Sequence, residues 1–140
     1  MMGFFFRFCL LSGSITFFSC QEREGVFRSV DAHQSGINFI NQLTPSNELN
    51  ILSYLYYYNG GGVAIADFNN DGLNDIYFTS NQGADKLYMN KGDLHFEDIT
   101  IVANIENSTG WTTGVSHVDI NNDGLLDIYV CKVGGYKTIE

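Results

Sequence analysis

Beyond Gly60 the chain consists of short apolar runs, each bounded by Gly, Asn or Asp residues. Short runs of β-branched and aromatic residues between such turn formers are typical of β-strands. No stretch in this part of the chain shows the 3.6-residue apolar period of a helix. The sequence therefore predicts strands in GVAIAD (62–67), DIYFTS (75–80), KLYMN (86–90), HFEDIT (95–100), GVSHVD (114–119) and DIYVCK (127–132).

The runs repeat with a step of 52 residues, which carries Asp67 onto Asp119. GGVAIADFNNDGLNDIYFTSN, from Gly61, aligns with TGVSHVDINNDGLLDIYVCKV, from Thr113. A period of this size indicates a solenoid, a propeller or an array. Four short strands per repeat, joined by Gly, Asn and Asp turns, are the pattern of a β-propeller blade. We therefore predict an all-β fold, with two blade repeats in residues 61–140 and the second repeat incomplete.

Residues 20–60 do not follow the repeat. We predict that they form an N-terminal strap with part of a blade, or a closing strand, and include a short helix or irregular stretch. The run ILSYLYYY (51–58) is a strand candidate, and in a strand Tyr54, Tyr56 and Tyr58 would share one face.

The first twenty residues resemble a bacterial lipoprotein signal. Arg7 is their single charge, and the apolar run that follows it is shorter than the roughly 20 residues of a transmembrane helix. The polar sequence QERE comes directly after Cys20. We expect residues 1–19 to be a signal peptide and Cys20 to be the lipidated first residue of the mature protein. A plain signal peptide and an uncleaved anchor are the alternatives.

The charge of the chain argues against nucleic-acid binding, and its cysteine content argues against a disulfide framework. The net charge is -9, with 16 acidic and 7 basic residues, so the chain lacks the basic face that nucleic-acid binding requires. With Cys20 acylated, Cys131 would have no disulfide partner, and its apolar run IYVCKV predicts a buried free thiol.

Two nine-residue segments, DFNNDGLND and DINNDGLLD, concentrate acidic residues in loops between predicted strands. Positions 1, 3, 5 and 9 of each segment carry side-chain oxygen, and Leu at position 7 could contribute its carbonyl. Gly at position 6 allows a sharp turn. Ligation by oxygen alone, with several carboxylates, favours Ca²⁺ over the smaller and geometrically stricter Mg²⁺. The candidate ligands are Asp67, Asn69, Asp71, Leu73 and Asp75 in the first segment, and Asp119, Asn121, Asp123, Leu125 and Asp127 in the second.

The segments differ from an EF-hand loop, which needs a Glu at position 12 and a helix on each side. Position 12 is Phe78 in the first segment and Val130 in the second, and both lie in strand-like runs. Position 9 must therefore complete the set of ligands. We interpret the ion as structural, because no neighbouring acid–base group suggests a catalytic one.

The pattern D-x-N-x-D-G-x-x-D after G-V-x-x-x-D resembles the FG-GAP/VCBS repeat, the calcium-loop blade of integrin α-subunit propellers and many bacterial surface proteins. The wider sequence, from SGINFINQL to GWTTGVSHVDINNDGLLDIYVC, is similar to large secreted VCBS-repeat proteins of Bacteroidetes type, some of which carry an ASPIC/UnbV module. The resemblance implies two structural Ca²⁺ ions held by the ten residues above. It also implies a ring of about seven blades, of which this chain would supply about two. We expect the chain to be an N-terminal fragment of a longer protein; assembly of several copies is the alternative.

The remaining candidates for chemistry have plainer interpretations. His33, His95 and His117 are far apart in the sequence, and we expect His95 and His117 to be packed or exposed strand residues rather than ligands. Trp111 and the tyrosines of residues 54–58 could stack on carbohydrate, although packing within and between blades is the favoured interpretation.

We therefore predict a calcium-binding, non-enzymatic propeller scaffold of a cell-envelope lipoprotein that binds a protein or a glycan. The alternative is the propeller portion of an envelope hydrolase or lyase that acts on polysaccharide. The expected location is the outer membrane or cell surface through the lipid anchor, or alternatively the periplasm or the exterior.

Overall fold

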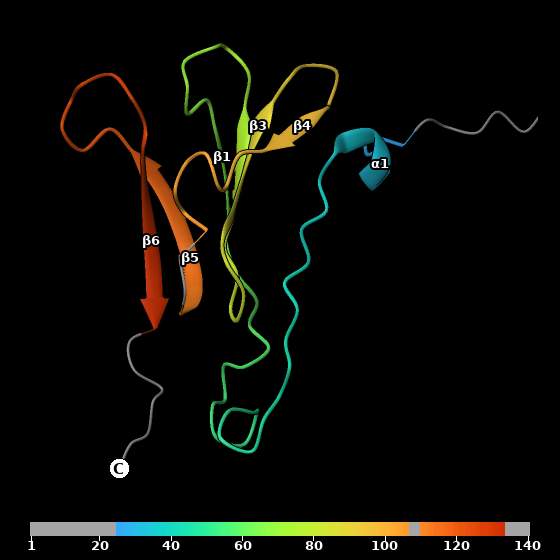
Figure 1. Ribbon diagram of the computed structural model, residues 1–140, viewed down its shortest axis with the longest axis vertical. Coiled ribbons are helices and arrows are strands. Elements are labelled where there is room, and N and C mark those ends of the chain that lie inside the picture. Colours follow the sequence, from blue (N-terminus) through green and yellow to red (C-terminus); the bar gives the residue numbers. More distant parts are fainter. Residues whose placement is uncertain (1–24, 107–109, 134–140) are drawn as a thin grey trace, which may run out of the picture.

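The computed structural model describes residues 25–106 and 110–133. It contains a four-stranded antiparallel sheet and a two-stranded one, with an N-terminal segment that runs along the larger sheet (Figure 1). The predicted signal peptide (1–19) and the predicted lipidation site Cys20 lie outside the described residues. The elements are α1 (Ala32–Ser35), β1 (Val63–Ala66), β2 (Asp75–Phe78), β3 (Lys86–Asn90), β4 (Phe96–Asp98), β5 (Trp111–Val118) and β6 (Asp127–Val133).

All six predicted strands are confirmed. β1 to β4 form a meander in the order β1-β2-β3-β4, and β5 pairs with β6. The loop between β1 and β2 and the loop between β5 and β6 occupy corresponding places in the two sheets, as the repeat requires (Figure 1). The protein is therefore mostly β with antiparallel sheets, and the described residues close no ring.

The two sheets pack face to face around a small core. Because successive side chains of a strand point to opposite faces, Ala64 shares one face of the larger sheet with its partner Tyr77 and with Leu87. These three residues are buried and form the centre of the core. Val115 and Val130, which pair across β5 and β6, pack against them from the smaller sheet.

The N-terminal strap, residues 37–44, covers part of the opposite face of the larger sheet (Figure 1). Phe39 stacks on Phe78 of β2 with ring centroids 4.8 Å apart. Between α1 and the sheet lies an open groove of about 370 Å³, with a lining that includes Ile37, Ile76 and Phe96. The larger sheet thus packs against the second sheet on one face and is partly covered by the strap on the other, where Val63 and Ile65 of β1 stay exposed.

The predicted strand in ILSYLYYY is wrong, because residues 51–58 form consecutive turns. The Asn50 side chain accepts hydrogen bonds from the backbone N–H groups of Leu52 and Ser53, which favours turns over an extended chain. Tyr57 is fully buried, and Tyr56 on one side of it is 62 % exposed.

Trp111, at the start of β5, packs on these turns. It is 1 % exposed, with its ring centroid 5.4 Å from that of Tyr54 and 5.3 Å from that of Tyr57. The favoured interpretation of this residue as a packing residue is confirmed.

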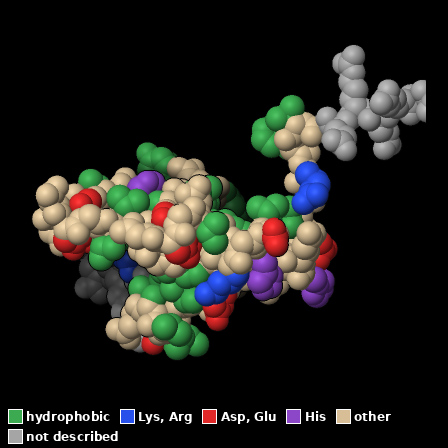
Figure 2. Space-filling view, turned by 90° about the horizontal axis from the view of Figure 1, so that it is seen from above, with side chains coloured by type: hydrophobic (Ala, Val, Ile, Leu, Met, Phe, Trp, Pro, Cys, Tyr) green, Lys and Arg blue, Asp and Glu red, His purple; other side chains and the backbone are tan. Residues whose placement is uncertain are grey.

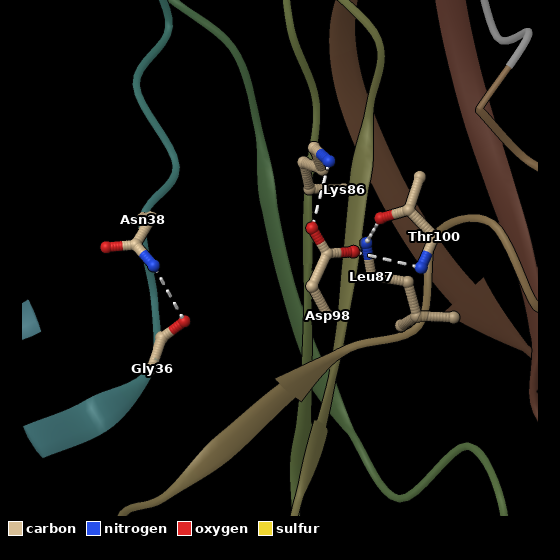
Figure 3. A network of polar contacts seen from close by, with 6 residues as sticks. All are labelled: Gly36, Asn38, Lys86, Leu87, Asp98 and Thr100. Atoms are coloured by element: carbon tan, nitrogen blue, oxygen red, sulfur yellow. Dashed lines mark hydrogen bonds and ion pairs between the residues drawn. The ribbon is translucent and has the colours of Figure 1, made fainter. Parts of the chain in front are cut away.

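A polar network fixes the pairing of β3 with the end of β4 (Figure 3). Lys86 forms an ion pair of 2.9 Å with Asp98, and the other carboxylate oxygen of Asp98 accepts from the N–H of Thr100. The Thr100 hydroxyl accepts in turn from the N–H of Leu87. Partial burial opposes ionisation of Asp98, but the hydrogen bonds from Thr100 and Lys86 outweigh it, so the pKa of this carboxyl is lowered.

The predicted burial of Cys131 is also wrong, since this thiol is exposed. Ile128 and Val130 face the larger sheet, so the residues that alternate with them, Tyr129 and Cys131, point the other way. Within the described part of the chain nothing covers that outer face of the smaller sheet.

The described residues include no helix long and apolar enough to cross a bilayer, since α1 has four residues.

Candidate metal centre

The two acidic segments are loops at the same end of the molecule. The first loop, residues 67–75, joins β1 to β2, and the second loop, residues 119–127, joins β5 to β6 (Figure 1). Figure 2 looks onto this end, where acidic side chains are exposed. Strands therefore flank both loops, as predicted, and the helices of an EF-hand are absent on either side of them.

Each loop turns through the same two left-handed residues. Asn70 has φ 59° and Asn122 has φ 61°, whereas Gly72 and Gly124 have φ 85° and 87°. Asn and Gly are the residues that adopt this conformation at least cost. The sequence thus specifies one backbone path at both places.

The Asp at position 1 holds the turn together. One carboxylate oxygen of Asp67 accepts from the N–H of Asp71 at 3.0 Å, and the other accepts from the N–H of Gly72 at 2.8 Å. Asp119 makes the equivalent bonds to Asp123 and Gly124 at 3.1 and 2.9 Å. The position 1 carboxylate thus binds backbone donors in its own loop.

Positions 3 and 5 are joined side chain to side chain. The amide nitrogen of Asn69 donates to Asp71 at 2.9 Å, and Asn121 donates to Asp123 at the same distance. The other oxygen of each Asp accepts from the N–H of the Leu at position 7, at 2.8 Å in both loops. The bond from the Leu125 N–H, followed by that from Asn121, lowers the pKa of Asp123.

Position 9 differs between the loops in its surroundings. Asp75 is fully buried and accepts from the N–H of Phe68 at 3.0 Å and from the N–H of Asn90 at 2.9 Å. Asp127 makes the first of these bonds, to the N–H of Ile120 at 3.0 Å, and is half-buried. The second bond of Asp75 depends on β3, which has no described counterpart in the second repeat.

The donor chemistry of each loop fits a hard cation, because three carboxylates, one amide oxygen and one carbonyl come from nine residues. In residues 25–106 and 110–133, however, no group of three or more His, Cys, Asp or Glu side chains is arranged to hold a metal ion. The side chains at positions 1, 3 and 5 instead bond to one another and to backbone N–H groups within each loop.

A direct hydrogen bond connects the two loops. The side-chain amide of Asn70 donates to the carbonyl oxygen of Gly124 at 3.0 Å. The sequence prediction assigned no role to Asn70, because position 4 is not a ligand position. The one feature of the sequence that could have indicated a role for Asn70 is that Asn122 occupies the same position in the second repeat.

A buried polar cluster beneath the β2–β3 turn was also missed. Asp85 is fully buried and accepts from the N–H of Ser80 at 2.8 Å and from the hydroxyl of Tyr77 at 3.1 Å. Asn81, also fully buried, exchanges hydrogen bonds with Asn41 of the strap and donates to the carbonyl of Thr112 in β5. This turn therefore fastens the strap and the second sheet to the first.

The histidines are separate in space as well as in sequence. His117 is exposed on β5, with its ring centroid 6.1 Å from that of Phe68. The Nδ1 atom of His95 lies 3.3 Å from the carbonyl oxygen of Gln34. His33 is exposed in α1. None of the three lies within the first or second loop.

Comparison with known proteins agrees with this geometry. A family described as FG-GAP-like repeat matches residues 67–130, from the start of the first loop into β6. Repeats of this kind commonly bind calcium. Cartilage acidic protein 1 of Xenopus tropicalis is 33 % identical over 72 residues, which cover 51 % of this chain and 11 % of that protein. No solved structure matches the chain. Residues 67–130 of this chain thus match the FG-GAP-like repeat, and the chain has distant homology to cartilage acidic protein 1, of which it spans about a tenth.

Proposed function

We propose that the chain is part of a calcium-binding, non-enzymatic scaffold in which each loop holds one structural Ca²⁺ ion. The ligands would be the side chains at positions 1, 3, 5 and 9 and the carbonyl at position 7. In the first loop they are Asp67, Asn69, Asp71, Leu73 and Asp75, and in the second they are Asp119, Asn121, Asp123, Leu125 and Asp127.

The observation that carries this proposal is that the two loops have the same hydrogen-bond geometry. Six hydrogen bonds recur between corresponding atoms, and no pair of equivalent distances differs by more than about 0.1 Å. Asn and Asp turns of merely local origin would not need the same acids at three positions in both copies. A shared ligand accounts for this repetition.

Calcium would relieve the repulsion between carboxylates that each loop brings together. Asn69, Asp71, Asn121 and Asp123 are all exposed, so their side chains can exchange mutual hydrogen bonds for ligation without disturbing the core. Ca²⁺ tolerates the irregular oxygen geometry that such a loop offers, whereas Mg²⁺ demands a near-ideal octahedron. The ion would then fix the connection between β1 and β2, and between β5 and β6.

We further propose that the repeats stack as blades of a propeller. In the 52-residue register, Val63 and Phe78 correspond to Val115 and Val130. The second pair packs on the face of the first repeat that carries Ala64 and Tyr77. This contact supports a head-to-tail relation between successive repeats, in which the outer face that includes Tyr129 would receive another blade.

Calcium should raise the melting temperature of the protein. Binding to the folded state alone stabilises by about 2.7 kcal/mol per site when free ligand exceeds its Kd a hundredfold. We expect the combined substitution Asp71→Ala and Asp123→Ala to abolish the rise, because each removes a ligand that could not be replaced from within its loop. Thermal unfolding followed by circular dichroism, in calcium and in EDTA, measures this difference.

Asp93→Asn is the matched control, since it removes an acidic charge from the neighbouring β3–β4 turn. Asp93 has φ 50°, which Asn tolerates, so the fold should be preserved. The control should keep the full calcium-dependent rise, and magnesium at the same concentration should give a smaller one. A wild-type melting temperature that is equal in calcium and EDTA would refute the calcium proposal.

Export and lipid anchoring are proposed from the sequence of residues 1–20 alone. If Cys20 is acylated, cells fed a radiolabelled fatty acid should incorporate label into the protein, and Cys20→Ser should remove it. Cys131→Ser is the control and should leave labelling unchanged. An unlabelled wild-type protein recovered free of membranes would exclude the lipid anchor.

A further inference from the structure

The loops touch through one side chain that is not a candidate ligand. Asn70, at position 4 of the first loop, lies between Asn69 and Asp71 and donates to the carbonyl oxygen of Gly124 at 3.0 Å. Gly124 lies between Asp123 and Leu125 of the second loop. A single hydrogen bond therefore joins the middle of one proposed cation site to the middle of the other.

Both ends of this bond are geometrically constrained. Asn70 is held in the left-handed region at φ 59°, and Gly124 at φ 87°. The N–H of Gly124 is bound to Asp119, and its carbonyl to Asn70, so the peptide units on both sides of Gly124 are held. A change in the path of either loop would strain or break the bond between them.

We propose that Asn70 couples the two loops, so that a cation bound in the first loop raises the affinity of the second. This inference rests on the proposed calcium binding. Ligation of Asn69 and Asp71 would fix the backbone on both sides of Asn70. The fixed amide would then hold Gly124 in place, which reduces the ordering that the second loop must undergo when it binds a cation. Thermodynamic linkage requires the reverse effect to be equally large.

The chain offers a matched control for this bond in Asn122, the position 4 residue of the second loop. Its φ of 61° is nearly the same as that of Asn70. In residues 25–106 and 110–133 its side chain makes no hydrogen bond to another loop. Asn70→Gly and Asn122→Gly therefore remove the same amide from the same conformation, which Gly adopts without strain. Of the two substitutions, Asn70→Gly alone removes the hydrogen bond between the loops.

The test is a double-mutant cycle read at the second loop. Calcium is titrated into the isotopically labelled full chain, and the amide signal of Gly124 reports the affinity of the second loop by NMR. This affinity is measured with the first loop intact and with it disabled by Asp71→Ala. Disabling the first loop should lower the calcium affinity of the second loop roughly two- to tenfold, which is the range expected for one net hydrogen bond.

Asn70→Gly should remove this dependence, so that the second loop binds equally well with and without Asp71→Ala. Asn122→Gly should preserve the ratio of the two second-loop affinities, measured with and without Asp71→Ala, because any local effect on the second loop changes both affinities equally. If Asp71→Ala impairs folding, Asp71→Asn replaces it, since the amide oxygen can still accept from the Leu73 N–H. The loss of the carboxylate charge weakens cation binding at the first loop, and the second loop is then titrated at calcium concentrations too low to fill the weakened first loop.

The outcomes separate the two proposals. Calcium binding at both loops with a ratio near one in the wild-type background overturns the coupling and leaves the calcium proposal standing. A ratio that survives Asn70→Gly overturns the role of Asn70. Absence of any calcium-dependent change at Gly72 and Gly124 overturns the calcium proposal together with the coupling that rests on it.

Discussion

At the scale of single residues, Asp85 shows how a charged group can organise packing without belonging to the loops. Its carboxylate is fully buried and accepts from the Ser80 N–H and the Tyr77 hydroxyl, with the Thr112 hydroxyl 3.5 Å away. It therefore connects the β2–β3 turn, strand β2 and strand β5. A buried acceptor with several donors is costly to remove, because the donors left behind lose their partner away from water.

Asp85→Ala should lower the free energy of unfolding by about 3 kcal/mol. Asp93→Asn, in the exposed β3–β4 turn, should change it by less than about 0.5 kcal/mol. Urea unfolding in EDTA measures both values without a contribution from bound cations. Equal and small effects of the two substitutions would mean that Asp85 does not have the structural role described.

Residue identities predicted the loops but not the surroundings of each residue. Gly at position 6 and the acids at positions 1, 5 and 9 indicated turn geometry because few residue types satisfy it. The full burial of Asp75, by contrast, follows from β3, whose Asn90 donates to it. The exposure of Cys131 likewise depends on which face of β6 meets the other sheet. An apolar run in the sequence does not indicate which of the two faces of the strand is buried.

At the scale of elements, the strands were predictable wherever apolar runs alternated with turn residues. β1, β2, β3 and β4 all follow this rule, and the 52-residue repeat supported the pair β5 and β6. The run 51–58 has strand-like composition but forms turns in the structure. Side-chain bonds from Asn50 and Ser53 to local backbone groups fold it into turns instead.

The strap illustrates a second limit at this scale. Residues 37–44 have few backbone hydrogen bonds and are positioned by distant side chains, including the bonds of Asn41 to Asn81 and the stacking of Phe39 on Phe78. Contacts between residues 40 positions apart leave no periodic trace in a sequence. The strap was therefore foreseeable as a departure from the repeat, and its course along the sheet was not.

At the scale of the whole molecule, the relation between repeats matters most. Gly62 and Gly114 occupy the same position in the two copies but differ in surroundings. A Cβ on Gly62 would lie 2.9 Å from the backbone nitrogen of Val115 and 3.1 Å from the Cα of Gly114, so β1 and β5 approach too closely for a side chain. Among the described residues, a Cβ on Gly114 would meet only the Cβ of Cys131, at an ordinary 3.7 Å. The second glycine faces the side where the proposed next blade would pack.

Substituting these two glycines tests the packing of the repeats directly. Gly62→Ala should lower the free energy of unfolding by about 1–3 kcal/mol, because the sheets must separate to admit the methyl group. Gly114→Ala should change it by less than about 0.5 kcal/mol in this chain. Neither glycine has a left-handed φ, so backbone strain does not distinguish them. Urea unfolding in EDTA gives the comparison, and equal effects at both positions would contradict the head-to-tail contact.

If further blades follow, as proposed, Gly114→Ala should become as destabilising as Gly62→Ala in a protein that contains the next repeat, because each glycine would then lie against the first strand of the repeat that follows it.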